Sequence, residues 1–162
     1  MLDIKILGEE VLKKHSSLVP KVDRPVQDLI QAMFETMYEG KGVGLAAPQV
    51  GESKRLFVCH ATDDKPRVFI NPEIIATSEE QVIFEEGCLS IPNVYCDVLR
   101  PAWITVQARD ENGKIFTLDA RGYLARVIQH EIDHLNGMLF IDRINEKKRQ
   151  RIMKNFKKTI KV

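Results

Sequence analysis

The chain has 162 residues, 44% of them hydrophobic and 29% charged, a length and balance that predict one domain with a buried core. The net charge of +1 gives no global reason to expect binding to DNA or to an anionic membrane. The sequence also lacks 18 consecutive apolar residues, so no membrane-spanning helix is predicted.

A helix is predicted near the N-terminus. Asp23 and Pro25 are residue types that favour an N-cap and a first helical turn. The apolar residues that follow recur at helical spacing, and Gly40 ends the pattern. The next stretch, "GKGVGLAAPQVG" (40–51), is too rich in Gly and Pro to be regular throughout.

Short β-type runs occupy the middle of the chain. They are "RLFVC" (55–59), "RVFIN" (67–71), "EQVIFEE" (80–86), "WITVQARD" (103–110) and "IFTLDAR" (115–121). Asn112 and Gly113, between the last two runs, are a strong hairpin signal. A second helical stretch begins after Gly122, and a basic helical tail covers 145–162. We expect one α+β domain over 1–162, with antiparallel strands around a central helix and with a helix at each end.

The stretch "QHEIDHLNG" (129–137) places His130 and His134 four positions apart, with Glu131 between them. On a helix these two side chains lie only about 40° apart around the axis, close enough to bind one ion. A buried histidine can also be an ordinary core residue whose N–H is satisfied. The HExxH spacing favours a metal site on the predicted central helix, and catalytic zinc-type sites usually take three protein ligands.

The third ligand is left open by the spacing. Asp142 and Glu146 lie downstream, where metallopeptidases with HExxH place it, but neither stands at a diagnostic distance. Upstream, Cys88 follows a glycine at the end of a predicted strand and offers a thiolate, which is a strong ligand for such ions. The alternative for Cys88 is a small buried hydrophobic residue, which is our expectation for Cys59.

Three separated stretches resemble the signature motifs of bacterial peptide deformylase, in the same order. They are "GVGLAAPQ" (42–49), "EGCLS" (86–90) and "QHEIDHLNG" (129–137). The resemblance implies one divalent ion held by Cys88, His130 and His134: Fe(II) natively, with Zn(II), Ni(II) or Co(II) possible in purified protein. The implied reaction removes the N-formyl group from the N-terminal methionine of newly synthesised proteins, and the implied partners are N-formylmethionyl nascent peptides.

The residue types suit this chemistry. A bound ion lowers the pKa of its water toward neutrality, and Glu131 can take the proton and later give it to the departing amine. The resemblance implies that the side-chain amide of Gln49 and the backbone N–H of Leu89 stabilise the oxyanion. Taken singly, Glu131 and Gln49 would be interpreted as ordinary surface residues.

Further residues are expected around this centre. The expected substrate contacts are Val43, Gly44, Gly87, Tyr123 and Val127. The apolar members would form a pocket for the methionine side chain, although any helix packed into a core shows similar residues. Asp133 is expected either to orient a ligand or pair with a cation such as Arg100, or to be simply exposed.

The tail carries eight Lys or Arg and one Glu from Asn145 onward, with Ile152, Phe156 and Ile160 at a spacing of four. We expect a terminal helix that docks this apolar stripe. The alternative is that its cations contact ribosomal RNA. Three cysteines without the spacing of a disulfide framework, and the absence of a signal peptide, predict a cytoplasmic protein, although a cleaved transit peptide would leave the same pattern.

Other functions stay open at this stage. A zincin-like metallopeptidase would share HExxH but would need a downstream third ligand. A non-enzymatic, metal-stapled RNA-binding module would suit the basic tail, but it would normally surround its ion with four protein ligands. A cysteine nucleophile with a histidine base is also chemically conceivable.

Overall fold

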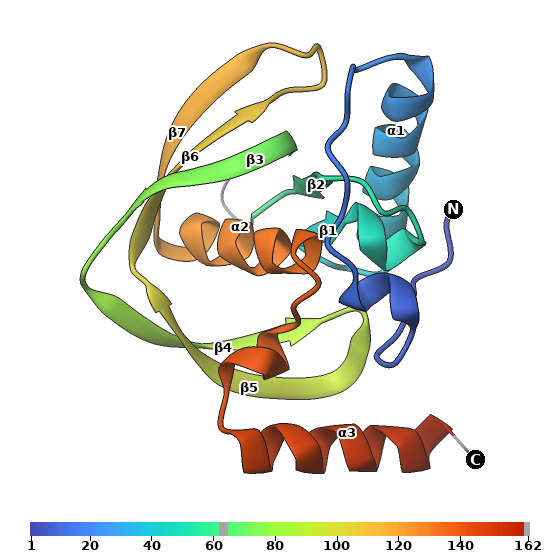
Figure 1. Cartoon of the computed structure of the whole chain (residues 1–162), viewed down its shortest axis with the longest axis vertical. Coiled ribbons are helices and arrows are strands. Elements are labelled where there is room, and N and C mark those ends of the chain that lie inside the picture. Colours follow the sequence, from blue (N-terminus) through green and yellow to red (C-terminus); the bar gives the residue numbers. More distant parts are fainter. Residues whose placement is uncertain (62–64, 161–162) are drawn as a thin grey trace.

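The computed structural model describes residues 1–61 and 65–160, the last three of them by their backbone only. Within that part, the chain forms three α-helices, seven strands and three short 3-10 helices. Helix α2 (Gly122–Leu135) lies near the middle of the molecule (Figure 1). The α+β class predicted from the sequence is confirmed.

Helix α1 (Arg24–Glu39) is the predicted N-terminal helix. The Asp23 side chain accepts a hydrogen bond from the Val26 N–H at 3.2 Å, which is the N-cap interaction, and Gly40 follows the last turn. The buried side of α1 packs against the first two strands of the larger sheet. The helix therefore begins and ends where the sequence predicts.

The larger sheet has five antiparallel strands in the order β1-β2-β3-β6-β7. Their bounds are Gly44–Ala46 (β1), Leu56–Cys59 (β2), Arg67–Thr77 (β3), Trp103–Arg109 (β6) and Ile115–Arg121 (β7). Strands β6 and β7 form the predicted hairpin, in which Gly113 has a φ of 80°. Strand β3 continues past its predicted end at Asn71, because an irregularity there, with a φ of 52°, interrupts the pairing without ending the strand.

The smaller sheet is a hairpin of β4 (Gln81–Cys88) and β5 (Ile91–Pro101). Strand β4 matches a predicted run, whereas β5 is not among the predicted elements. The buried positions of β5 alternate at Cys96, Val98 and Arg100, but the polar Arg100 hides that period-two pattern. Arg100 faces inward because it pairs with a glutamate of β4.

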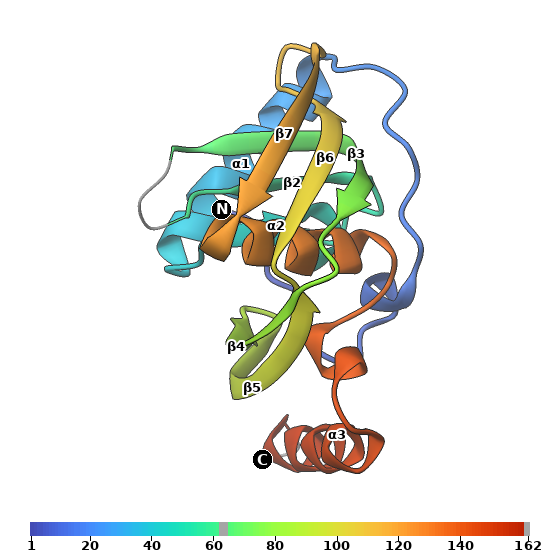
Figure 2. The same ribbon diagram turned by 90° about the vertical axis from the view of Figure 1, so that its left-hand side faces the viewer.

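Helix α2 lies between the two sheets, as Figures 1 and 2 show from perpendicular directions. All eleven residues from Ala125 to Leu135 are buried. Apolar residues of this helix share one core cluster with Phe57 and Phe69 of the larger sheet. Its buried polar residues therefore need partners within the protein, and most of those partners come from the β4–β5 hairpin.

The described chain ends with η3 (Phe140–Arg143) and α3 (Glu146–Ile160). Ile152 and Phe156 of α3 are partly buried against a cluster that includes Val98 of β5. The docked apolar stripe predicted for the tail is confirmed at these two positions, while the Ile160 side chain lies outside the described residues. In the described part of the chain, no helix combines the length and apolar character needed to cross a bilayer.

Candidate metal centre

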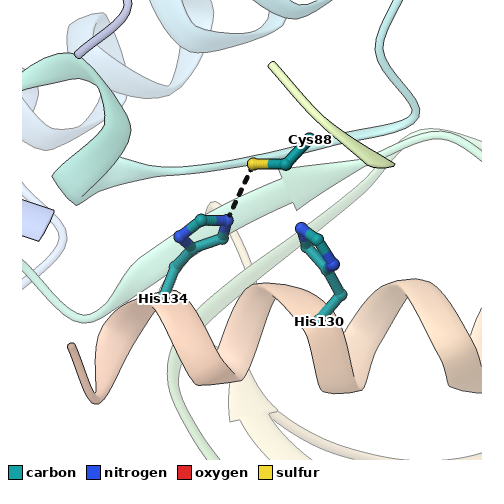
Figure 3. A group of neighbouring side chains, drawn as sticks. All are labelled: Cys88, His130 and His134. Atoms are coloured by element: carbon teal, nitrogen blue, oxygen red, sulfur yellow. Dashed lines mark hydrogen bonds between the residues drawn. The ribbon is translucent and has the colours of Figure 1, made fainter. Parts of the chain in front are cut away.

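Three side chains from two elements meet between α2 and the β4–β5 hairpin. Cys88 ends β4, while His130 and His134 project from α2 toward its sulfur (Figure 3). The candidate ligand atoms of the three residues all lie within 4.8 Å of one another. Cys88 Sγ is 3.3 Å from His134 Nε2. Residues that are 46 positions apart in sequence thus form one compact group of donors.

This donor set suits a transition-metal ion. His130 Nδ1 is hydrogen bonded to Glu86 Oε1 at 2.9 Å, which leaves Nε2 as the free ring nitrogen. His134 presents its Nε2 to the sulfur of Cys88. One thiolate and two imidazoles are donors that Fe(II), Zn(II) and similar ions accept. The three residues could therefore hold one metal ion.

Glu86 joins the centre to a buried ionic network. Besides its contact with His130, the carboxylate accepts hydrogen bonds from Arg100 Nε at 2.6 Å and Nη2 at 2.9 Å, and from Arg126 Nη1 at 2.8 Å. Burial alone would raise the pKa of Glu86, but the bonds from His130 and Arg100 hold that pKa well below its usual range. The carboxylate is therefore charged, and it accepts the His130 N–H.

Asp133 extends the same network. It accepts a hydrogen bond from Arg100 Nη1 at 2.8 Å and two from Arg143, from Nε at 2.6 Å and from Nη2 at 2.7 Å. Arg100 therefore bridges Glu86 of β4 and Asp133 of α2. Of the environments expected for Asp133, the structure places it against Arg100. Burying a charge without a partner costs free energy. Removing one charged residue of this network would therefore leave other buried charges unpaired and lower the stability of the fold.

Gln49 lies in η2 (Ala47–Val50), directly after β1, and only 1% of it is exposed. Its Oε1 accepts the Ala46 N–H at 2.9 Å, and this bond fixes the orientation of the amide. The Nε2 group then donates to Ser90 Oγ at 3.1 Å and to Cys88 Sγ at 3.4 Å. The Gln49 amide is thus a neutral donor held beside the three candidate metal ligands. Leu89, the other predicted donor, follows Cys88 directly in the chain.

Glu131 is buried next to Gly44 of β1. Its Oε1 has no hydrogen-bond partner among the described residues. Burial raises the pKa of Glu131 to about 7. A Cβ placed on Gly44 would lie 2.5 Å from Glu131 Oε2, so only glycine leaves room for the carboxyl group. A buried carboxyl group with this pKa can accept or donate a proton near neutral pH.

A pocket of about 620 Å³ lies beside these residues. The five predicted substrate contacts all line it: Val43, Gly44, Gly87, Tyr123 and Val127. Gln49, Leu89 and Glu131 also line the pocket. A Cβ on Gly87 would lie 2.6 Å from the ring of Tyr95, so this glycine makes room for an aromatic wall.

Most of the chain matches one known protein family. Residues 1–150 match the model of polypeptide deformylase. The chain belongs to the polypeptide deformylase family. It is 52% identical to the peptide deformylase of Treponema pallidum (strain Nichols), over 96% of this chain and 95% of that protein. It is 48% identical to the peptide deformylase of Rhizobium meliloti (strain 1021), over 96% of this chain and 92% of that protein.

A solved deformylase structure agrees closely with this fold. The crystal structure of peptide deformylase from Ehrlichia chaffeensis in complex with actinonin matches with a TM-score of 0.95 at 40% identity. The match covers 98% of this chain and 97% of that chain. As a member of the deformylase family, the chain is an enzyme of the hydrolase class.

The alternative functions find no support in these relatives, all of which carry the deformylase name. The geometry also disfavours a zincin-like metallopeptidase, because its downstream ligand candidates lie elsewhere in this deformylase. Asp142 and Glu146 both pair with Arg149 of α3. The Cys88, His130 and His134 group is instead the candidate metal site of a family of metalloenzymes.

Three residues that contact this deformylase centre or its neighbours are not among the site residues predicted from the sequence: Glu86, Ser90 and Arg126. A period-two pattern could have drawn attention to Glu86, which lies two positions before Cys88 on β4. Ser90 and Arg126 carry no comparable signal, because their contacts depend on how distant segments pack.

Proposed function

We propose that this deformylase removes the N-formyl group from the N-terminal formylmethionine of newly synthesised proteins. Hydrolysis joins a water oxygen to the formyl carbon, breaks the formamide C–N bond and releases formate and a free α-amine. The observation that carries this proposal is the grouping of Cys88, His130 and His134 beside the buried Glu131, whose Oε1 has no hydrogen-bond partner among the described residues. The family supports the class of substrate.

Cys88, His130 and His134 are the proposed ligands of one divalent ion, which we take to be Fe(II) natively. Zn(II), Ni(II) and Co(II) suit the same donors, so the purified protein can carry any of them. When bound, the ion would supply Lewis-acid chemistry, lowering the pKa of water at the site and polarising the formyl oxygen. The close approach of the three donor atoms supports this assignment.

Glu131 is the proposed proton carrier. It lies one residue after His130 and does not need to bind the ion, so its carboxylate is free to take the proton of the attacking water. The same group then gives that proton to the departing amine. The pKa of about 7 that burial gives this carboxyl group suits both steps.

Gln49 and Leu89 are the proposed oxyanion donors. Gln49 Nε2 and the backbone N–H of Leu89 would stabilise the negative charge that develops on the formyl oxygen. The fixed orientation of the Gln49 amide supports this role, because a preorganised donor does not have to reorient during the reaction.

The pocket is the proposed site for the methionine side chain. Val43, Tyr123 and Val127 would contact the thioether chain, and Gly44 and Gly87 would let the peptide backbone approach. Because Gly44 and Gly87 also make room for Glu131 and Tyr95, a side chain at either position would disturb the site as well as the substrate.

Helix α2 is the proposed scaffold of the reaction within one catalytic domain of residues 1–162. It carries both histidines of the centre, together with Glu131 and Asp133. Asp133 and Arg100 would hold the metal-binding histidine His130 indirectly, because Arg100 also bonds Glu86, which contacts the His130 ring.

We further propose that the enzyme works in the cytoplasm and that α3 contacts ribosomal RNA. Lys147, Lys148, Arg151, Lys154 and Lys157 of α3 are exposed. The apolar side of the helix docks on the protein, so these cations can face a partner. No DNA or membrane partner is proposed.

The decisive experiment compares two substrates. The protein should release formate from formyl-Met-Ala and leave an internal peptide bond intact, and a chelator should abolish the first activity. Cleavage of the internal bond would support a metallopeptidase instead. Formate release that survives complete removal of the metal would overturn the proposed mechanism.

A further inference from the structure

The N-terminal segment, residues 5–16, contacts each of the three chain segments that build the centre. These segments are η2 with Gln49, the end of β4 with Cys88 and the turn after it, and the end of α2 with His134. In Figure 1 the N-terminal segment, drawn in blue, passes beside η2 and the end of α2. Because the three segments are distant in sequence, contacts from a fourth segment help to fix their separations.

The first bridge joins Gln49 to Ser90. The Lys5 N–H donates to the Gln49 carbonyl at 2.7 Å, and the Leu7 N–H donates to the Ser90 carbonyl at 2.8 Å. The side chains of Gln49 and Ser90 are themselves hydrogen bonded at 3.1 Å. The proposed oxyanion donor and the turn that follows Cys88 are thus joined twice, once by the side chains of Gln49 and Ser90 and once by residues 5–7.

The second bridge caps the end of α2. The Ser16 N–H and Oγ donate to the Leu135 carbonyl at 2.9 and 2.8 Å, and only 2% of Ser16 is exposed. Leu135 follows His134, and the last carbonyls of a helix have no partner within the helix. A Cβ on Gly137 would lie 2.5 Å from the Lys13 carbonyl oxygen, so the two backbones touch here.

We propose that residues 5–16 form a positioning strap that holds the oxyanion donor, the thiolate and the second histidine in one geometry. This inference rests on the proposed function of the centre. A displacement of about 1 Å can slow an enzyme about a hundredfold, so the four hydrogen bonds from residues 5–16 to three site segments can control the rate. None of residues 5–16 lines the pocket, so their effect on the reaction would pass through Gln49, Ser90 and Leu135.

The α2 bridge is tested by metal release, which needs no turnover. Ser16→Ala removes one bond to the Leu135 carbonyl, and the matched control Ser17→Ala alters an exposed neighbour. We expect Zn(II) to leave Ser16→Ala roughly threefold to tenfold faster than the wild type when a chromogenic chelator competes for it. The Ser17→Ala rate should equal that of the wild type, and thermal unfolding checks that both variants are folded.

The first bridge is tested by replacing single backbone amides with esters, using α-hydroxy acids in place of Leu7 or Ile6. The ester at Leu7 lacks the N–H that bonds Ser90, whereas the Ile6 N–H bonds the Glu9 side chain, which is outside the centre. We expect the Leu7 ester to lower kcat on formyl-Met-Ala roughly fivefold with KM nearly unchanged, and the Ile6 ester to leave both unchanged. In a Gln49→Ala background the Leu7 effect should be smaller, since part of it acts through that donor.

These comparisons separate the strap from the proposed function. A wild-type protein that releases no formate counts against the proposed function, and the Zn(II) comparison still decides the strap. Equal Zn(II) release from Ser16→Ala and Ser17→Ala would overturn the strap. So would equal effects of the two esters, or a Leu7 effect that persists in full without Gln49.

Discussion

At the scale of single residues, Glu131 offers the sharpest test of the mechanism. Glu131→Ala removes the proposed proton carrier and leaves the three proposed metal ligands in place. We expect kcat to fall by about 10² to 10⁴ with the metal content unchanged, as measured by formate release and elemental analysis. Glu35→Ala, at an exposed position of α1, is the control. Near-normal turnover by Glu131→Ala would refute its role.

Gly44 is predicted to act on the reaction through Glu131. In Gly44→Ala the new Cβ would meet Glu131 Oε2 at 2.5 Å, so the carboxyl group has to move. Because a shift of about 1 Å can cost a hundredfold in rate, we expect kcat to fall by about 10². Thermal unfolding and metal content should change little. A variant with wild-type kcat would show that the position of Glu131 is not critical.

Glu86 is predicted to control metal affinity. Glu86→Gln keeps the size of the side chain and its hydrogen bond to His130, but removes the charge opposite Arg100 and Arg126. We expect the Kd for Zn(II) to rise by about 10- to 100-fold in a chelator competition. Asp97→Asn, at an exposed position of β5, serves as the matched control. Equal affinities for the two variants would contradict this prediction.

Among the secondary-structure elements, the basic helix α3 leads to a prediction about how ribosome binding depends on salt. If its exposed cations meet ribosomal RNA, the affinity for ribosomes should fall steeply as ionic strength rises. Replacing Lys147 and Lys154 together with Ala should weaken binding and flatten the salt dependence, as measured by cosedimentation. Lys21→Ala, far from α3 in sequence and exposed, is the control. Binding that does not respond to salt would exclude the electrostatic contact.

The elements also show what a sequence can predict. The α1 helix and the β6–β7 hairpin follow from local signals, namely the Asp23 cap and the Asn112–Gly113 turn, and both form as predicted. Strand β5 does not follow from its own residues, because Arg100 is buried only in the presence of Glu86 and Asp133. Local chemistry determines turns and caps, whereas a buried ion pair depends on residues that are distant in the chain.

The same distinction holds at the centre. His130 and His134 can be recognised as a pair from the sequence, because their spacing places both side chains on one face of a helix whatever the tertiary structure. Cys88 is distinguished from Asp142 and Glu146 as the third proposed ligand only by the family motif or by the packing of β4 against α2. The strap contacts of Leu7 and Ser16 could not be predicted from spacing, since they depend on where distant segments meet.

At the scale of the whole molecule, metal binding should stabilise the fold. The proposed ligands join β4 to α2, so the ion would link the smaller sheet to the helix. Removing it with a chelator should lower the midpoint of thermal unfolding by roughly 5–10 °C, and adding Zn(II) should restore the midpoint. An unchanged midpoint after verified metal removal would show that the site is rigid without its ion.

Helix α2 supplies both the proposed chemistry and a large part of the core, since every residue from Ala125 to Leu135 is buried. In a saturation mutagenesis screen, this stretch should therefore tolerate fewer substitutions than the exposed side of α3. Nearly every substitution in this stretch would disturb the packing of the core, even at positions that carry no catalytic group. Few positions of the helix can therefore change during selection for a faster enzyme. Improved variants should thus arise mainly outside α2, for example at the exposed positions of the β4–β5 hairpin.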